Sequence, residues 1–154
     1  MSILDVASSK STWRGYSYHI SGNVIYIKKM NDTTYSGTVK GSDNRQYDVT
    51  IDTLHPKKSI CNCPFAEGNR KVCKHKVALF FKAFPEEAER YYNEVMEYER
   101  QLEQKEAEEE KLYQKVEDYI IKMNKSEAQQ ALYELLLDGP EWQFDKFVRE
   151  HWIE

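Results

Sequence analysis

Four residues of the types that bind zinc stand close together in this sequence. Nine residues separate the pair Cys61 and Cys63 from Cys73, and His75 follows two positions later. Zinc prefers a tetrahedral shell of thiolate sulfur and imidazole nitrogen, and four protein ligands form the closed shell of a structural site. Single cysteines are often small buried apolar residues instead, but two short pairs at this spacing favour a metal. We therefore predict one structural Zn²⁺, bound by Cys61, Cys63, Cys73 and His75.

The spacing of the ligands constrains the backbone around them. Cys61 and Cys63 are two residues apart, so an extended segment points both side chains to one face, and Pro64 ends that strand. On a regular helix, Cys73 and His75 would project about 200° apart. We therefore expect Cys73 in the loop and His75 in the first helical turn, with residues 66–69 forming the turn between the two pairs. The expected product is a zinc-stapled ββα unit.

Basic residues surround both ligand pairs. Cations near a thiol lower its pKa and favour the thiolate that metal binding requires. A basic surface of this kind can also contact the phosphates of a nucleic acid. The candidate residues are Lys57, Lys58, Arg70, Lys71, Lys74 and Lys76.

The segments before the zinc motif have the pattern of short antiparallel strands. From about Tyr16 to Ile60, aromatic and β-branched residues alternate with polar ones between turn signals, most regularly at Tyr47, Val49 and Ile51. Apolar residues then recur at helical spacing from Val77, and Pro85 stops or restarts the helix. The predicted fold class is α+β, with a small antiparallel sheet, the ββα unit and an all-α C-terminal region. The predicted domains are 13–85 for the zinc-binding domain and 86–154 for an acidic helical region.

The helical region carries an interrupted seven-residue repeat. One position of the repeat is apolar at Val95, Leu102, Val116 and Met123, and the alternate position holds Tyr98, Leu112 and Tyr119. Lys105 and Glu109 interrupt these two rows, which predicts an extended helix or a helical hairpin with a solvated middle. Ser126 with Gln129 is expected to cap the next helix. A last helix from Pro140 places five residues at helical spacing and is expected to bury them as core: Phe144, Phe147, Val148, His151 and Trp152.

Composition bounds the class of protein. The chain has 154 residues, and no apolar run approaches the roughly 18 residues of a membrane helix. The first residues lack a basic start followed by an apolar stretch, and all three cysteines lie between residues 61 and 73. These features predict a soluble protein of the reducing cytoplasm that has no membrane partner. Residues 1–85 carry 13 basic and 6 acidic side chains, whereas residues 86–154 carry 9 and 20. The split indicates a half that can approach a polyanion and a half that is repelled by one, although long helices often carry many surface Glu residues.

The zinc motif and its surroundings resemble the SWIM zinc finger. Cys-x-Cys, nine residues and Cys-x-His follow a strand-rich segment and precede an apolar helix. The dipeptide Arg14-Gly15, Tyr18 and Gly22 fit bacterial members, as do Cys-x-Cys-Pro-Phe and Cys-Lys-His-Lys-Val-Ala, so the resemblance covers roughly Trp13 to Phe84. It implies a ββα zinc module with a DNA-binding or protein-interaction role, of the kind found among SWI2/SNF2-type ATPases, transposase-like plant proteins and ubiquitin-pathway proteins. This chain has no phosphate-binding loop motif, so any such ATPase would be a separate chain or a missing part of a longer one.

Two functions follow from these observations. The first is nucleic-acid binding through the basic residues around the zinc. The alternative is a protein-interaction adaptor, in which the finger is a rigid platform and the acidic helices dock on a partner. We expect neither an enzyme nor a small-molecule substrate, because four protein ligands leave no open position on the zinc for water.

Overall fold

The computed structural model describes residues 2–42 and 44–152. The chain divides into two compact units, Met1–Glu97 and Tyr98–Glu154. The predicted domain boundary at residues 85 and 86 stays a prediction.

Two helices open the first unit, α1 (Ile3–Val6) and α2 (Ser9–Ile20). Ser8 caps α2, because its side-chain oxygen accepts a hydrogen bond from the backbone N–H of Ser11 at 3.2 Å. The prediction that strands begin at Tyr16 is wrong, since this segment lies in α2. The alternation of large residues after Tyr16 suggested a strand. The helix instead buries Thr12 and Gly15, which are three residues apart and share one helical face.

Four strands form one antiparallel sheet in the order β1-β2-β3-β4, as the sequence predicted. Their bounds are β1 (Val24–Lys29), β2 (Thr34–Lys40), β3 (Gln46–Asp52) and β4 (Ile60–Cys61). A short 3₁₀ helix, η1 (Pro56–Lys58), connects β3 to β4. Val39, Val49 and Ile51 are buried on the core face of the sheet, and Val49 is paired with Cys61 of β4. The sheet therefore carries the first zinc ligand at its last strand.

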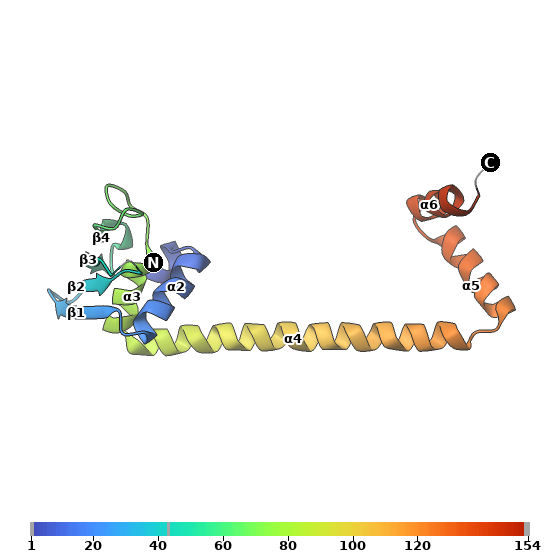
Figure 1. Cartoon of the computed structure of the whole chain (residues 1–154), viewed down its shortest axis with the longest axis horizontal. Helices are drawn as coiled ribbons and strands as arrows, with labels where there is room; N and C mark the ends of the chain where they lie inside the picture. The colour runs from blue at the N-terminus through green and yellow to red at the C-terminus, as the bar shows by residue number, and fades with distance from the viewer. Residues whose placement is uncertain (1, 43, 153–154) are drawn as a thin grey trace. The chain divides into compact units, whose positions relative to one another are not determined.

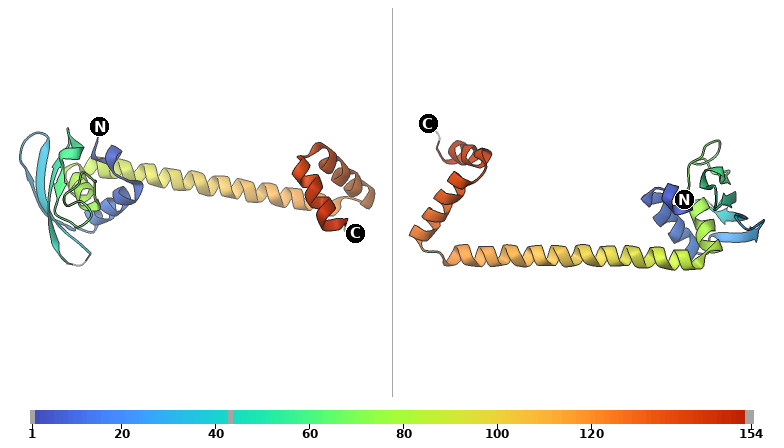
Figure 2. Two further views of the ribbon diagram at one scale, coloured as in Figure 1. Left: turned by 90° about the horizontal axis from the view of Figure 1, so that it is seen from above. Right: turned by 180° about the vertical axis from the view of Figure 1, so that it is seen from behind.

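Helix α3 (Lys74–Ala83) lies between the sheet and α2 (Figure 1), and the view from above agrees (Figure 2). Its Val77, Leu79 and Phe81 are fully buried. The crossing of α2 and α3 is close, because a Cβ atom added to Gly15 would lie 2.4 Å from Cβ of Val77. α3 is thus held on both sides, and its N-terminal end positions the second ligand pair.

The rest of the chain is helical: α4 (Pro85–Lys122), α5 (Lys125–Asp138) and α6 (Glu141–His151). As predicted, a helix restarts at Pro85. This helix, α4, has Glu86 and Glu87 in its first turn, where acidic side chains suit the helix dipole. The predicted cap of α5 is wrong by two residues, because Asn124 and Glu127 form the capping box. Among the described residues, no helix combines the length and the apolar character that crossing a membrane requires.

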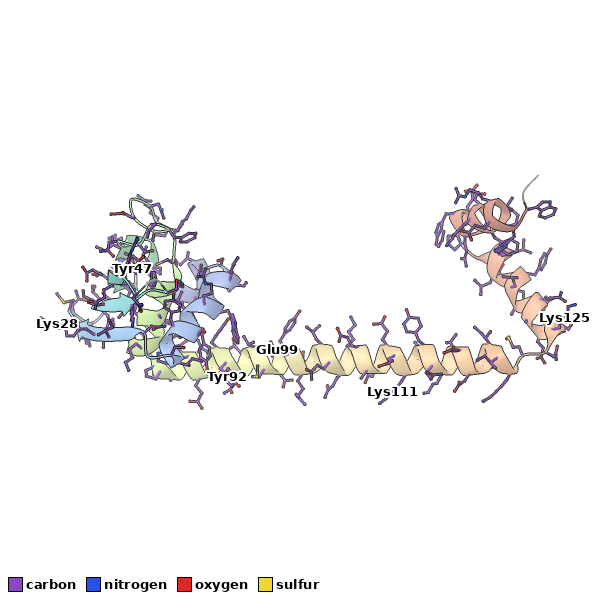
Figure 3. All side chains as sticks on the ribbon, viewed as in Figure 1. Lys28, Tyr47, Tyr92, Glu99, Lys111 and Lys125 are labelled. Carbon is purple, nitrogen blue, oxygen red and sulfur yellow. The ribbon has the colours of Figure 1, made fainter. Side chains whose placement is uncertain are left out.

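The expected burial of the last helix is also wrong. No residue of α5 or α6 is buried, Phe144 is 45% exposed and Trp152 is 76% exposed. Helical spacing places apolar residues on one face, but a face becomes core only when another layer covers it. Figure 3 likewise shows side chains of α4, among them Glu99 and Lys111, extending into solvent.

Candidate metal centre

The four predicted ligands lie together in the structure. The ligand atoms of Cys61, Cys63, Cys73 and His75 are all within 4.8 Å of one another, and all four residues are buried. Sγ of Cys61 is 3.8 Å from Nδ1 of His75. Nδ1 is therefore the imidazole nitrogen that faces the cysteines.

Each ligand is placed by a different local feature. Cys61 ends β4, and the chain then turns back at Cys63, whose carbonyl accepts hydrogen bonds from the N–H groups of Ala66 and Glu67. Gly68 has φ +70°, a conformation that favours glycine and lets the loop return to α3. Cys73 is the extended N-cap residue of α3, with φ −88° and ψ 165°, and His75 is in the first turn. The prediction that this pair straddles the junction of loop and helix is confirmed.

The cluster fits a zinc ion. Zn–S bonds of about 2.3 Å and Zn–N bonds of about 2.0 Å place the donors of a tetrahedral site roughly 3.5–3.8 Å apart. Donors that already lie within 4.8 Å of one another need only small side-chain adjustments to reach this geometry. Three thiols and one imidazole are one of the usual ligand sets of structural zinc sites. The cluster binds one structural zinc ion.

The thiols of the cluster differ in acidity when no metal is bound. A hydrogen bond from Cys61 lowers the pKa of Cys73 to about 4, and His75 and the backbone N–H of Lys76 act in the same direction. The same bond to Cys73, together with burial, raises the pKa of Cys61, and burial raises that of Cys63. Cys73 is therefore the thiol that ionises most readily, and binding of zinc displaces the protons of the other two.

Aromatic rings fix the orientation of His75. The ring of Tyr47 stacks on the imidazole, with centroids 4.6 Å apart and planes 23° apart, and Tyr18 approaches from a second direction at 5.6 Å. Sequence reasoning did not assign this role to either tyrosine. The sequence did contain a signal for Tyr47. Tyr47 precedes Val49 by two residues, so the two side chains share one face of β3, and Val49 is the register partner of Cys61.

Comparison with known proteins adds the family of this segment. A family model described as the SWIM zinc finger matches residues 47–84. Residues 47–84 are therefore similar to the SWIM zinc finger, and we refer to this matched segment as the SWIM finger. The SWIM finger runs from β3 through β4 to the end of α3, which is the predicted ββα unit, whereas α1, α2, β1 and β2 precede the matched residues. Searches of curated proteins and of solved structures find no match to the chain.

The basic residues predicted to contact nucleic acid do not form one group. Lys57 and Lys58 lie in η1, where both line a pocket of about 650 Å³ together with Arg70. The ammonium group of Lys71 lies 5.3 Å from the ring centroid of Phe65, in the loop of the SWIM finger. Nζ of Lys74 hydrogen-bonds to the hydroxyl of Tyr18 and lies 4.2 Å from the centroid of its ring. All five side chains are at least partly exposed.

Lys76 is different, and its prediction as a nucleic-acid contact is wrong. Its side chain is fully buried, and Nζ donates a hydrogen bond to the carbonyl of Lys71 at 2.8 Å. Burial lowers the pKa of Lys76, while the negative charge of Cys73, Cys61 and Cys63 raises it. The ammonium group therefore serves the SWIM finger from inside, where it offsets thiolate charge and holds the loop.

Sequence reasoning missed a basic pocket beside the zinc cluster. The basic pocket, of about 460 Å³, is lined by Cys63, Cys73 and His75 and by residues of α2, β3, the loop and α3: Lys10, Ser11, Arg14, Tyr47, Phe65 and Lys74. Lys10 and Arg14 are four residues apart and so share a face of α2. That spacing was the available signal, but it becomes visible only once the segment is assigned to a helix.

Proposed function

We propose that this protein is a zinc-dependent nucleic-acid-binding module. The observation that carries the proposal is the basic pocket, where the side chains of Lys10, Arg14 and Lys74 converge from two helices beside the metal cluster. Among the described residues that line this pocket there is no Asp or Glu. Three cations without a carboxylate favour a polyanionic ligand, since phosphate contacts supply most of the affinity in nucleic-acid binding.

The other side of the pocket suits a nucleotide. Phe65 is 54% exposed at the loop, and Tyr47 forms part of the wall through the ring that stacks on His75. Aromatic side chains next to a basic groove stack on bases, and such contacts tolerate any sequence. This combination of charge and aromatic surface favours single-stranded DNA or RNA over a duplex whose bases are already stacked.

The role of zinc in the basic pocket is structural. Cys63, Cys73 and His75 line the basic pocket, so the pocket keeps its shape only while the zinc holds the strand, the loop and the helix together. Four protein ligands fill the tetrahedral shell, and a catalytic zinc requires an open position for water or substrate. We therefore assign binding, and no catalysis, to this site.

The test is binding of a fluorescent single-stranded oligonucleotide by the zinc-loaded protein, measured by anisotropy over a range of salt concentrations. The double variant Lys10→Gln and Arg14→Gln should weaken binding to every sequence tested. Each lost phosphate contact should also reduce the magnitude of the slope of log affinity against log salt by roughly 0.7–0.9. Zinc content should not change, because neither residue is a ligand.

The matched control is the double variant Lys28→Gln and Lys29→Gln, which removes the same charge from exposed positions at the end of β1. Figure 3 labels Lys28 there. It should lower affinity far less than the change in the pocket. Equal losses in the two variants would show a general charge effect without a defined site. A parent protein that binds neither DNA nor RNA at low salt would overturn the proposal.

The adaptor function is the second candidate, and the second unit favours it. Large apolar side chains remain exposed there, for example Leu112 at 61%, Tyr119 at 66% and Trp142 at 64%. Exposed apolar side chains of this number mark surfaces that bind other proteins. The family resemblance suggests a separate SWI2/SNF2-type ATPase as one partner class. The salt dependence of the affinity distinguishes the two functions. Nucleic-acid affinity falls steeply as the salt concentration rises, whereas the affinity of an apolar helix face for a partner protein changes little.

A further inference from the structure

Part of α4 carries an apolar seam that none of the described residues of its own unit covers. The seam consists of the residues at alternating steps of three and four from position 98 to position 116: Tyr98, Leu102, Lys105, Glu109, Leu112 and Val116. All six are exposed, including Tyr98 at 63% and Leu112 at 61%. Steps of three and four keep these side chains on one face of the helix, which is the spacing by which two helices pack along their length.

The spacing of the residues in the seam is the same in both directions along the helix. Starting from Ala107, the seam residues on the two sides lie at equal distances along the helix. Glu109 and Lys105 are equally far from Ala107, and the same holds for Leu112 and Leu102 and for Val116 and Tyr98. In each of the two outer pairs both residues are apolar, whereas the central pair consists of a cation and an anion.

We propose that this seam binds the same seam of a second copy of the chain, with the two helices antiparallel and related by a two-fold axis beside Ala107. In this arrangement, Lys105 of each chain faces Glu109 of the other, so the polar interruption becomes two interchain ion pairs. Leu102 packs on Leu112 and Tyr98 on Val116, twice each. The paired segment spans 18 steps of the helix, or about 27 Å at 1.5 Å per residue.

Other pairings of the same seam bring like charges together or place charged residues against apolar ones. A parallel pair in register sets Lys105 against Lys105 and Glu109 against Glu109. An antiparallel pair shifted by one seven-residue repeat sets Lys105 against Leu102 and Glu109 against Tyr98, so neither charge has an interchain ionic partner. A buried polar pair that is satisfied in only one arrangement specifies the orientation and register of paired helices. Charge complementarity therefore selects a second copy over an unrelated helix.

This inference does not rest on nucleic-acid binding, and salt distinguishes the two. Residues 98–116 carry six acidic and four basic side chains, so two copies repel weakly outside the seam. At about 0.5 M salt, where such exposed charges are screened, the dimer should persist or strengthen. Binding of an oligonucleotide should instead weaken, so either finding can fail without the other.

The test is sedimentation equilibrium of the full zinc-loaded chain and of charge variants in the seam. Lys105→Glu and Glu109→Lys should each raise the dimer dissociation constant by about tenfold or more, because each places like charges in two seam layers. Combining both substitutions in one chain restores opposite charges and should return the constant to within a few-fold of the parent value. Lys111→Glu is the matched control outside the seam and should change it little. Far-ultraviolet circular dichroism checks that α4 stays helical in every variant.

Orientation is tested by disulfide formation between Leu102→Cys and Leu112→Cys chains, with the zinc cluster loaded so that its own cysteines are protected. A mixture of the two variants should form a cross-linked dimer, whereas neither variant alone should, because residues 102 of two antiparallel chains are about 15 Å apart along the axis. Cross-linking within either variant alone would contradict the antiparallel arrangement. A parent chain that stays monomeric at high concentration would overturn the proposal and would assign the seam to α5, α6 or another protein. Loss of the dimer in Lys105→Glu without rescue by the double variant would also overturn it.

Discussion

The two units of this chain are both folded in regular elements, but they differ in what holds the elements together. In Met1–Glu97, a sheet, α3 and α2 form three layers, and side chains such as Val39, Ile51 and Phe81 are fully buried between them. In Tyr98–Glu154, α5 and α6 bury no residue, and their stability depends on local devices such as the capping box of Asn124 and Glu127. Packing and metal stabilise the first unit, whereas helix propensity and capping stabilise the second.

This difference predicts that loss of zinc affects the two units unequally. Cys73→Ser, or a strong chelator, should remove the metal and unfold the zinc-stapled part of the first unit. The expected effect is large, because zinc binding by small modules supplies on the order of 10 kcal/mol that is also folding free energy. Near-ultraviolet circular dichroism should lose the signal of the packed rings around His75, while far-ultraviolet spectra should retain much of the helix of α4, α5 and α6.

The control for this prediction is Glu67→Gln, a change at an exposed position of the same loop. It should keep both zinc and the near-ultraviolet signal. If chelation instead removed all helical signal, the second unit would depend on the first, and the contrast between the units would be wrong.

A smaller effect is expected from overpacking the crossing of α2 and α3. Gly15→Ala places a Cβ atom 2.4 Å from Cβ of Val77 and 3.0 Å from the carbonyl oxygen of Lys74. Neither is the free end of a flexible side chain, so the two helices must move apart. The free energy of unfolding of the zinc-loaded first unit should fall by about 1–3 kcal/mol, measured from urea unfolding curves followed by near-ultraviolet circular dichroism.

The matched change in the second unit should have almost no effect. Leu137 is 58% exposed in α5, so Leu137→Ala removes little buried surface and replaces it with a good helix former. We expect a change within about 0.5 kcal/mol in the unfolding of the isolated chain. A large loss at Leu137, comparable with that at Gly15, would show that α5 has a packing partner and that the two units are more alike than described.

The sequence predicted the metal site well because its information is local. Cys61, Cys63, Cys73 and His75 lie within fifteen positions, and their residue types restrict the chemistry. The spacing of Cys73 and His75 even located the start of α3, since a regular helix would have separated their side chains. The alternation in β3 was likewise sufficient to predict its strand.

Other features depend on contacts that the sequence does not display. Tyr16, Tyr18 and Ile20 alternate like a strand, but the cap at Ser8 and the packing against α3 select a helix. Lys76 has the charge of a surface residue and is buried, because the carbonyl of Lys71 and the nearby cysteines surround it. The basic pocket combines segments some 60 residues apart in the chain, so only the fold reveals it.

The C-terminal helices show the opposite limit of sequence reasoning. Phe144 and Trp152 have the spacing of a buried face and are exposed in the structure. Periodicity indicates which residues lie on one face of a helix, whereas burial of that face requires a second surface of matching shape. The prediction of a core there assumed a partner layer that the second unit does not provide among its described residues.

The structural role of zinc in the first unit requires a closed shell made only of protein ligands. X-ray absorption spectroscopy of the zinc-loaded chain measures that shell directly. We predict three sulfur neighbours at about 2.3 Å and one nitrogen neighbour at about 2.0 Å, with one zinc per chain and no water ligand. A shell that contains an oxygen neighbour, or fewer than three sulfurs, would contradict the closed structural shell of Cys61, Cys63, Cys73 and His75.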